Sequence, residues 1–547
     1  MPATHEVLNQ VPPIELNTAD DAALREALQR EGAGWAEAEV RELGALAGDP
    51  EVIELGRLAN LYPPVLHTHD RYGHRIDEVE YIPAYHQLMQ MAVGAGLHAA
   101  AWHEDRPGAH AARAAKSYVW QVDSGHMCPI SMTYSVVPAL RHAPELAALY
   151  EPLFASRHYE PGLRAPLTKR GLIAGMSMTE KQGGSDVRSN TTRAVAQGDG
   201  SYLVTGHKWF TSAPMSDVFL ILAQAPGGLS CFFLPRVLPD GSRNAMYIQR
   251  LKDKLGNKSN ASSEVEYDQA RAWLVGEEGR GVAAIVEMVN GTRLDCLGGA
   301  ASGMRAGLTQ AIHHVTHREA FGRHLVDQPL MRNVIADLAV DAEAAVTVLM
   351  RLAGATDRAI AGDESEALLR RIGLAVSKYW VCKRWPMHVA EALECLGGNG
   401  YGEDSRMPTL YREAPLMSIW EGSGNVAVLD VLRAMTKQPD TVQAYFTEVE
   451  RGLGADRRFD DALKRLQSDL AALSATTDID AIQLGARRLV ETMALVLQGS
   501  LLLRHGHPAV ADAFCATRLG HDCGIAYGTL PSGLDLSAII ERARVAG

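Results

Sequence analysis

The first long stretch of the chain, from about residue 20 to residue 164, carries apolar residues at the spacing of amphipathic helices. Leu24 and Leu28 follow Asp21, an acidic residue suited to the start of a helix. Prolines punctuate the stretch and separate one helical segment from the next. The pattern therefore predicts an N-terminal helical domain over residues 1–167.

From residue 168 to residue 288 the helical spacing gives way to short β-type runs. Three of these runs, at 201–205, 218–223 and 230–234, are separated by glycine-containing turns. Such spacing is typical of strands joined by tight turns. We expect this segment to form an all-β domain.

Helical patterns return after residue 289. They predict a helical bundle domain over 289–436 and, after a break at Pro439, a C-terminal helical extension over 441–547. One helix face of the extension carries Leu463, Leu466, Leu470 and Leu473. Because the order of helices, strands and helices contains no βαβ alternation, a parallel-sheet nucleotide fold is not expected.

Composition and charge narrow the class of protein. Of the 547 residues, 47% are hydrophobic and 22% are charged, which is typical of a folded globular protein. The net charge of −12 opposes binding of the surface as a whole to DNA or anionic membranes. We find neither a membrane-spanning stretch nor a secretory signal and expect a cytoplasmic protein. The seven cysteines form no C-x-x-C pair, and His313 and His317 lack the glutamate of H-E-x-x-H, so no metal site is expected.

A glycine turn near residue 422 is the first candidate for chemistry. Residues 422–427 fit G-x-G-x-x-A, but without a surrounding βαβ unit they do not indicate a Rossmann fold. Two glycines at a helix start still let backbone N–H groups approach a pyrophosphate, although a plain helix-start turn is the alternative. Glu421 precedes the turn and follows Ile419-Trp420, a setting in which burial would raise the pKa of a carboxyl toward that of a general base. A solvated loop glutamate is the other interpretation.

Two segments of the β region offer groups for a flat polar ring. Residues 178–187 combine hydroxyl and glycine residues in a loop that follows an apolar run, and residues 207–212 place an aromatic wall beside two hydroxyls. A surface turn and a half-buried strand end are the structural alternatives.

Together these motifs resemble the acyl-CoA dehydrogenase superfamily. The motifs, in the order of that superfamily, are M-T-E-K-Q-G-G-S-D-V (178–187), H-K-W-F-T-S (207–212), K-L-G (254–256), G-E-E-G-R-G (276–281), R-E-A-F-G (318–322), L-G-G-N-G-Y (396–401) and I-W-E-G-S-G-N (419–425). Further segments are similar to its alkylation-response branch, namely 30–35, 55–60, 128–133, 250–262 and the extension beyond about 440. The resemblance implies an α+β, acyl-CoA dehydrogenase-like fold: an N-terminal helical domain, a central β-barrel-like domain and a C-terminal four-helix bundle, followed here by an extra helical domain.

The resemblance also implies FAD, held between the subunits of a homotetramer. The positions that match contacts with the isoalloxazine and its chain are Met178, Thr179, Gly183, Gly184, Ser185, Val187, Trp209, Thr211 and Ser212. Those that match contacts with the FAD of a neighbouring subunit are Arg318, Phe321, Gln328, Glu394, Gly397 and Gly398. The glycine turn adds Ile419, Trp420, Gly422, Ser423, Gly424 and Asn425. Glu394 stands where many relatives carry glutamine, and Gln328 lies one position from the usual glutamine.

By resemblance, Glu421 is the base that removes the Cα proton of an acyl-CoA while a hydride leaves Cβ for flavin N5. Thr292 occupies the position from which some relatives supply their base, and a threonine cannot serve. Arg293 matches a family arginine near the site, and we expect it to serve in positioning rather than in proton transfer.

Three functions remain open at this stage. The first is a true acyl-CoA dehydrogenase of fatty-acid or branched-chain oxidation without a DNA role. The second, favoured by the alkylation-response likeness, is a flavoprotein of that response with weak dehydrogenase activity, and the third is a binding protein with structural FAD. The extension implies DNA binding, but its eleven Lys and Arg against thirteen Asp and Glu predict only weak, sequence-independent duplex binding. The sequence leaves the acyl chain and the electron acceptor open.

Overall fold

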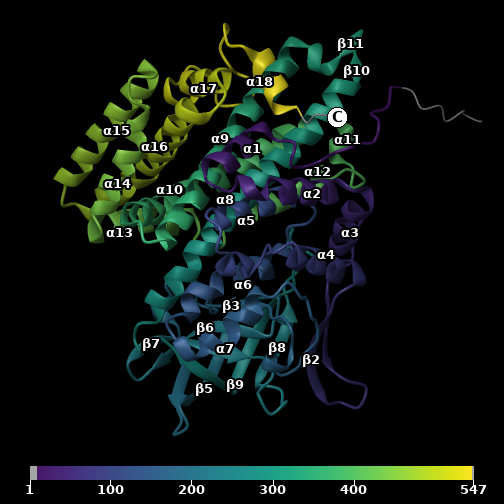
Figure 1. The fold of residues 1–547 in the computed structure, drawn as a ribbon, viewed down its shortest axis with the longest axis vertical. Helices are drawn as coiled ribbons and strands as arrows, with labels where there is room; N and C mark the ends of the chain where they lie inside the picture. Colours follow the sequence, from purple (N-terminus) through teal and green to yellow (C-terminus); the bar gives the residue numbers. More distant parts are fainter. Residues whose placement is uncertain (1–8, 545–547) are drawn as a thin grey trace, which may run out of the picture. The chain divides into compact units, whose positions relative to one another are not determined.

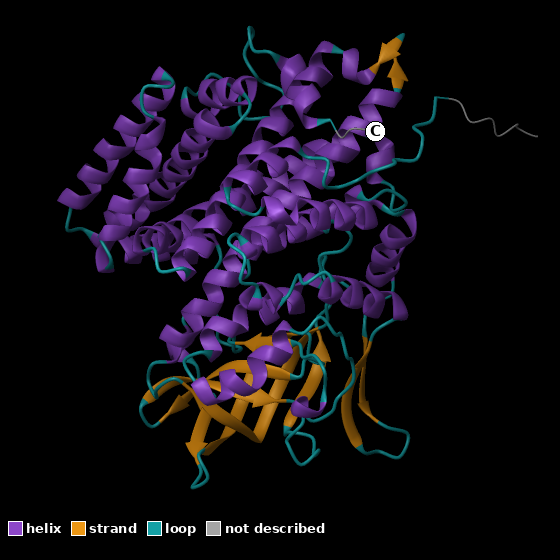
Figure 2. Ribbon diagram, in the orientation of Figure 1, coloured by secondary structure: helices purple, strands orange, loops and turns teal. Residues whose placement is uncertain are grey.

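The computed structural model describes residues 9–544 and divides them into two compact units. We call them the barrel unit (50–116 and 122–295) and the helical unit (9–49, 117–121 and 296–544). Figure 1 traces the chain through both, and Figure 2 shows that the strands of the large sheet are confined to the barrel unit. The four-domain division of the chain stays a prediction.

The barrel unit combines helices with a seven-stranded sheet. Its helices are α3 (Pro50–Leu61), α4 (Pro83–Gly94), most of α5 (Ala109–Val119), α6 (Met127–Leu140), α7 (Pro144–Ala155) and the first part of α8 (Gly281–His317), with short 3₁₀ turns at Ala99–His103, Pro166–Thr168 and Val187–Ser189. Its strands are β1 (Val65–His69), β2 (Arg75–Glu80), β3 (Ala174–Ser177), β4 (Arg193–Ala196), β5 (Ser201–Ser212), β6 (Val218–Ala225), β7 (Gly228–Pro235), β8 (Met246–Leu251) and β9 (Ser262–Val275).

The sheet closes on itself, which confirms the barrel-like prediction. Neighbouring strands follow the order β3-β6-β4-β5-β9-β7, and β6 pairs with β7 as well as with β4. Residues 219–222 of β6 are buried on both faces, which explains why the sequence of this strand is a continuous apolar run. On one face Leu220 and Leu222 share a core with Val137 of α6 and Phe154 of α7.

The predicted helical pattern is wrong over residues 65–80. There β1 and β2 form an antiparallel hairpin whose turn contains Gly73 at a φ of 88°. In β2 the buried residues Asp77 and Val79 alternate with less buried ones, the two-residue period of a strand. That alternation is short, and the helical patterns on either side masked it.

The helical unit contains the remaining helices. They are α1 (Ala22–Arg30), α2 (Glu37–Gly48), the rest of α8, α9 (Pro329–Ile360), α10 (Glu364–Glu394), α11 (Gly398–Tyr401), α12 (Met407–Met417), α13 (Gly424–Lys437), α14 (Asp440–Val449), α15 (Arg457–Ala475), α16 (Ile479–His505), α17 (Pro508–Phe514) and α18 (Leu536–Ala543). A small hairpin, β10 (Glu319–Ala320) and β11 (Arg323–His324), follows α8, and short turns of 3₁₀ or π type lie at Gly34–Ala36, Leu325–Asp327, Glu450–Gly452 and Cys515–Leu519. Asp21 caps α1 by accepting a hydrogen bond from Leu24 N, as the sequence predicted.

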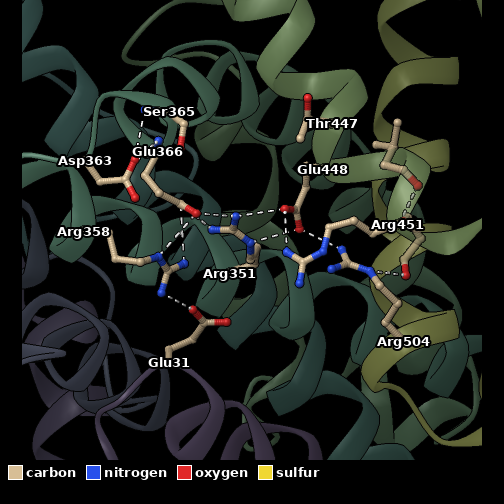
Figure 3. A network of polar contacts seen from close by, with 12 residues as sticks. Glu31, Arg351, Arg358, Asp363, Ser365, Glu366, Thr447, Glu448, Arg451 and Arg504 are labelled. Carbon is tan, nitrogen blue, oxygen red and sulfur yellow. Dashed lines mark hydrogen bonds and ion pairs between the residues drawn. The ribbon is translucent and has the colours of Figure 1, made fainter.

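A buried ion-pair network joins the C-terminal extension to α9 and α10 (Figure 3). Arg351 of α9 donates to Glu366 of α10 at 2.7 Å and to Glu448 of α14 at 2.9 Å, and Arg504 of α16 donates to Glu448 at 2.7 Å. The extension therefore contacts the bundle through charges that are largely removed from water. Within residues 9–544 no helix combines the length and apolar character needed to cross a membrane.

Candidate active site

The loop 178–187 leaves β3 and is fixed at its beginning. Thr179 O accepts a hydrogen bond from Trp209 N at 2.8 Å, which joins the two segments that the sequence singled out. Gly184 lies so close to Thr179 that a Cβ at this position would be 2.3 Å from Thr179 Oγ1. Gly183 has a φ of 130°, and Ser185 is exposed. The loop thus presents backbone and hydroxyl groups from a rigid base.

A buried ion pair that sequence analysis missed lies beneath this loop. Glu180 and Lys208 have fully buried side chains, 2.8 Å apart, and Glu180 also accepts from the backbone N–H of Thr191 at 2.7 Å. Burial acts to raise the pKa of Glu180, but the hydrogen bond from Lys208 holds it well below its ordinary range. Glu180 lies inside the 178–187 motif and Lys208 inside the 207–212 motif. Their position in these motifs was the only sign in the sequence of a role at the site.

The segment 209–212 ends β5 with an aromatic ring next to positive charge. Lys252 Nζ lies 3.4 Å from the centroid of Trp209, and Arg250 lies 5.7 Å from it. Thr211 is buried and its hydroxyl pairs with that of Ser177, while Ser212 Oγ lies 3.4 Å from Ser262 Oγ. This surface suits a ligand that combines a flat ring with negative charge.

Thr292 and Arg293 occupy buried positions on the barrel-unit part of α8. Thr292 Oγ1 donates a hydrogen bond to Val289 O of the same helix at 3.1 Å, so its side chain satisfies a backbone carbonyl of that helix. Arg293 is 6% exposed. A guanidinium at such a depth offers hydrogen-bond donors in a fixed planar arrangement, which fits a positioning role better than proton transfer.

In the helical unit, Glu421 lies in an irregular segment between α12 and α13. Its φ is 56°, a left-handed conformation that is uncommon for a residue with a side chain, and Gly422 follows at 99°. Trp420 Nε1 is buried without a hydrogen-bond partner among the described residues, and Ile419 is 61% exposed. An unusual backbone next to an unsatisfied buried donor is typical of a functional site.

Two cations that the sequence did not indicate lie at the start of α13. Arg487 of α16 donates from Nε to Asn425 Oδ1 at 2.8 Å, and a Cβ on Gly424 would be 2.7 Å from Lys383 Cε. Burial, followed by repulsion from Arg487 and Lys378, lowers the pKa of Lys383. Positive side chains at a helix N-terminus, where the helix dipole is also positive, suit a phosphate group. Ser423 precedes this helix as its N-cap residue.

The remaining predicted positions lie on exposed turns of the helical unit. Arg318 donates to Asn9 O, Gln328 Nε2 donates to Ala320 O at 3.0 Å across the small hairpin, and Phe321 at its tip is 97% exposed. Gly397, with a φ of 59°, follows the end of α10 and precedes Gly398, the first residue of α11. Glu394, the last residue of α10, is exposed beside this turn.

The structure thus brings two groups of the predicted residues together, while those at 318–328 and 394–398 lie on separate turns. Residues 178–187 adjoin 209–212 in the barrel unit, which also contains Arg293. Residues 419–425 adjoin Lys383 and Arg487 in the helical unit.

Comparison with known proteins finds relatives along nearly the whole chain. The description "Adaptive response protein AidB N-terminal domain" matches residues 9–161, and the middle and C-terminal domains of acyl-CoA dehydrogenase match residues 175–270 and 279–436. The chain is 47% identical to AidB of Escherichia coli (strain K12), covering 95% of this chain and 96% of that protein. It is 33% identical to acyl-CoA dehydrogenase family member 11 of Caenorhabditis elegans, covering 83% and 78%. The solved structure of Caenorhabditis elegans ACDH-11 in complex with C11-CoA is similar with a TM-score of 0.87 at 29% identity, covering 95% and 94%.

Proposed function

The chain belongs to the AidB branch of the acyl-CoA dehydrogenase family, a family of FAD-dependent oxidoreductases acting on CH–CH bonds, and from this premise we propose that it oxidises acyl-CoA thioesters to their α,β-unsaturated products. The observation that carries the proposal is Glu421, held in a left-handed backbone at the start of the glycine turn. The complex of its Caenorhabditis elegans relative with C11-CoA supports an acyl-CoA substrate.

The residues present fit FAD on observations independent of the family. Lys383 and Arg487 at the start of α13 match a pyrophosphate, and Trp420 Nε1 is a buried donor in need of an acceptor. The Trp209 ring, with Lys252 Nζ 3.4 Å from its centroid, combines an aromatic wall with positive charge. In the proposal, the 178–187 loop and Trp209 are the FAD contacts of the barrel unit, and Lys383, Trp420 and Arg487 are those of the helical unit. When bound, FAD supplies the acceptor for the hydride that leaves Cβ.

The chain's own part in the reaction is to take and hold a proton. The Glu421 carboxylate accepts the Cα proton as the Cα–H bond breaks, and the electron pair of that bond becomes the second bond between Cα and Cβ. The hydride that leaves Cβ carries one proton and two electrons, so the acyl chain loses one proton from Cα and one hydride from Cβ in all. Arg293 positions the substrate in this proposal.

Anaerobic mixing of the purified holoprotein with a panel of saturated acyl-CoA thioesters tests the proposal. Glu421→Gln, which keeps the shape of the side chain, should retain FAD yet slow flavin reduction by about 10²- to 10⁴-fold. Glu403→Gln is a matched control, because Glu403 is an exposed surface carboxylate paired with Arg412. Reduction of the Glu421→Gln protein at the rate of the unmutated protein would place the base elsewhere, and a protein that cannot be loaded with FAD would contradict the cofactor.

The second function that we propose is a role in the response to DNA alkylation damage. In that case the protein's dehydrogenase activity is weak. Its support is the match of residues 9–161 to the AidB N-terminal domain. For DNA contact we propose weak, non-specific duplex binding, because at least seven of the eleven basic residues in 441–547 already form ion pairs with carboxylates of this chain. A homotetramer is proposed as well, since the exposed Phe321 and Tyr401 stand on the turns that match intersubunit FAD contacts. Sedimentation of the holoprotein tests the tetramer, and a monomer would contradict it.

A further inference from the structure

A buried ammonium group lies beside the backbone of the candidate base. Lys378, on α10 and only 1% exposed, donates from Nζ to the carbonyl of Trp420 at 2.8 Å and to that of Gly422 at 2.5 Å. These carbonyls belong to the irregular segment between α12 and α13. Because a partly buried carbonyl outside regular structure needs a donor from elsewhere, Lys378 satisfies a requirement that the turn itself creates.

The two hydrogen bonds enclose the left-handed residues. One fixes the peptide that precedes Glu421, and the other fixes the peptide that follows Gly422. Glycine adopts a left-handed φ without steric cost, whereas glutamate does not. A clamp on both sides therefore opposes the return of Glu421 to a right-handed conformation, which would turn its carboxylate in another direction.

We propose that Lys378 is a positioning residue for the reaction: it holds the 420–422 backbone in the left-handed turn that aims Glu421 at the substrate. The inference rests on the proposed function, because it assigns Lys378 a purpose only if Glu421 removes the proton. Lys378 does not itself contact the substrate in this proposal. It acts through the backbone on either side of the base.

The first test measures hydrogen exchange of the full-length holoprotein by mass spectrometry. Lys378→Met keeps the length of the side chain but removes all donors, so amides in peptides covering 416–426 should exchange at least about ten-fold faster, with little change elsewhere. Lys437→Met, at the exposed end of α13, is the matched control and should leave these amides unchanged. Acceleration spread along the whole helical unit would identify Lys378 as a general structural residue and overturn the proposal.

The second test separates binding from the chemical step. Lys378→Met should keep the FAD content and the acyl-CoA dissociation constant within about three-fold while flavin reduction slows by roughly 100-fold, the effect of a misplaced catalytic group. Lys378→Arg, which retains donors, should recover at least about ten-fold of that loss.

The outcomes distinguish this inference from the function on which it rests. If Glu421→Gln is inactive but Lys378→Met reduces its flavin within about three-fold of the unmutated rate, the positioning role is wrong and the base assignment stands. If Glu421→Gln retains the unmutated rate, the base assignment fails whatever Lys378 does. Equal losses of rate and of substrate affinity in Lys378→Met would also overturn the positioning role.

Discussion

Replacing Glu448 by glutamine should loosen the packing of the C-terminal extension on the helical bundle. The carboxylate is 4% exposed and accepts hydrogen bonds from Arg351 at 2.9 and 3.0 Å and from Arg504 at 2.7 Å (Figure 3). The amide of glutamine has the same shape but no charge. It therefore leaves two buried guanidinium groups with an incomplete set of partners.

Two independent arguments give the size of the effect. Burial acts to raise the pKa of Glu448, but the hydrogen bonds from Arg351 and Arg504 lower it from an ordinary 4.5 to about 2. At about 1.4 kcal/mol for each pKa unit, this amounts to about 3 kcal/mol. Removal of one member of a buried ion pair costs a similar ~3–5 kcal/mol.

Hydrogen exchange in α14 and α16 measures this loss locally. A loss of about 3 kcal/mol corresponds to roughly 100-fold faster exchange where these helices open as a unit. Glu450→Gln is the control, because Glu450 is exposed and its replacement should change the local opening free energy by less than about 0.5 kcal/mol. Exchange in Glu448→Gln within about three-fold of the control would refute the reasoning.

The lowered pKa of Glu448 predicts how the stability of this packing depends on pH. A folded-state pKa below the unfolded value stabilises the protein above pH 4.5, and this stabilisation is lost as the pH falls toward about 2. The difference in opening free energy between the unmutated protein and Glu448→Gln should therefore shrink over this range. A difference that stays constant from neutral pH to about pH 3 would show that the charge of Glu448 contributes nothing.

Lys208→Met should lower the melting temperature and the FAD content together, because it leaves the buried carboxylate of Glu180 unpaired at a cost of ~3–5 kcal/mol beneath the 178–187 loop; unchanged FAD retention would contradict this. Gly303→Ala should destabilise the protein by ~1–3 kcal/mol in thermal unfolding, since its Cβ would lie 2.0 Å from Trp385 Cζ2, whereas Gly298→Ala, with its nearest atom at 3.5 Å, is the tolerated control. Duplex DNA should bind the full-length protein weakly at about 50 mM salt and not measurably at about 200 mM. Tight, salt-insensitive binding would show that the ion pairs of the extension do not limit its affinity for DNA.

The sequence by itself determined the local elements and the chemistry of their ends. Apolar spacing after Asp21 predicted α1, the runs at 218–223 and 230–234 became β6 and β7, and Pro439 marks the break between α13 and α14. Such features depend on neighbours within one turn of helix or along one strand, so they can be read from spacing. The motif around Glu421 was visible for the same reason.

Only the tertiary structure revealed the partners that come from distant parts of the chain. The sequence contains Lys378 as a single charge within an apolar helix face, and nothing in its spacing indicates that it reaches the carbonyls on either side of Glu421. The same holds for Lys208 beneath the 178–187 loop. Periodicity specifies which face of an element is buried, but the pairing of a buried charge is set by the elements that fold against it, because in a low-dielectric interior the charge persists only where the tertiary structure supplies its partner.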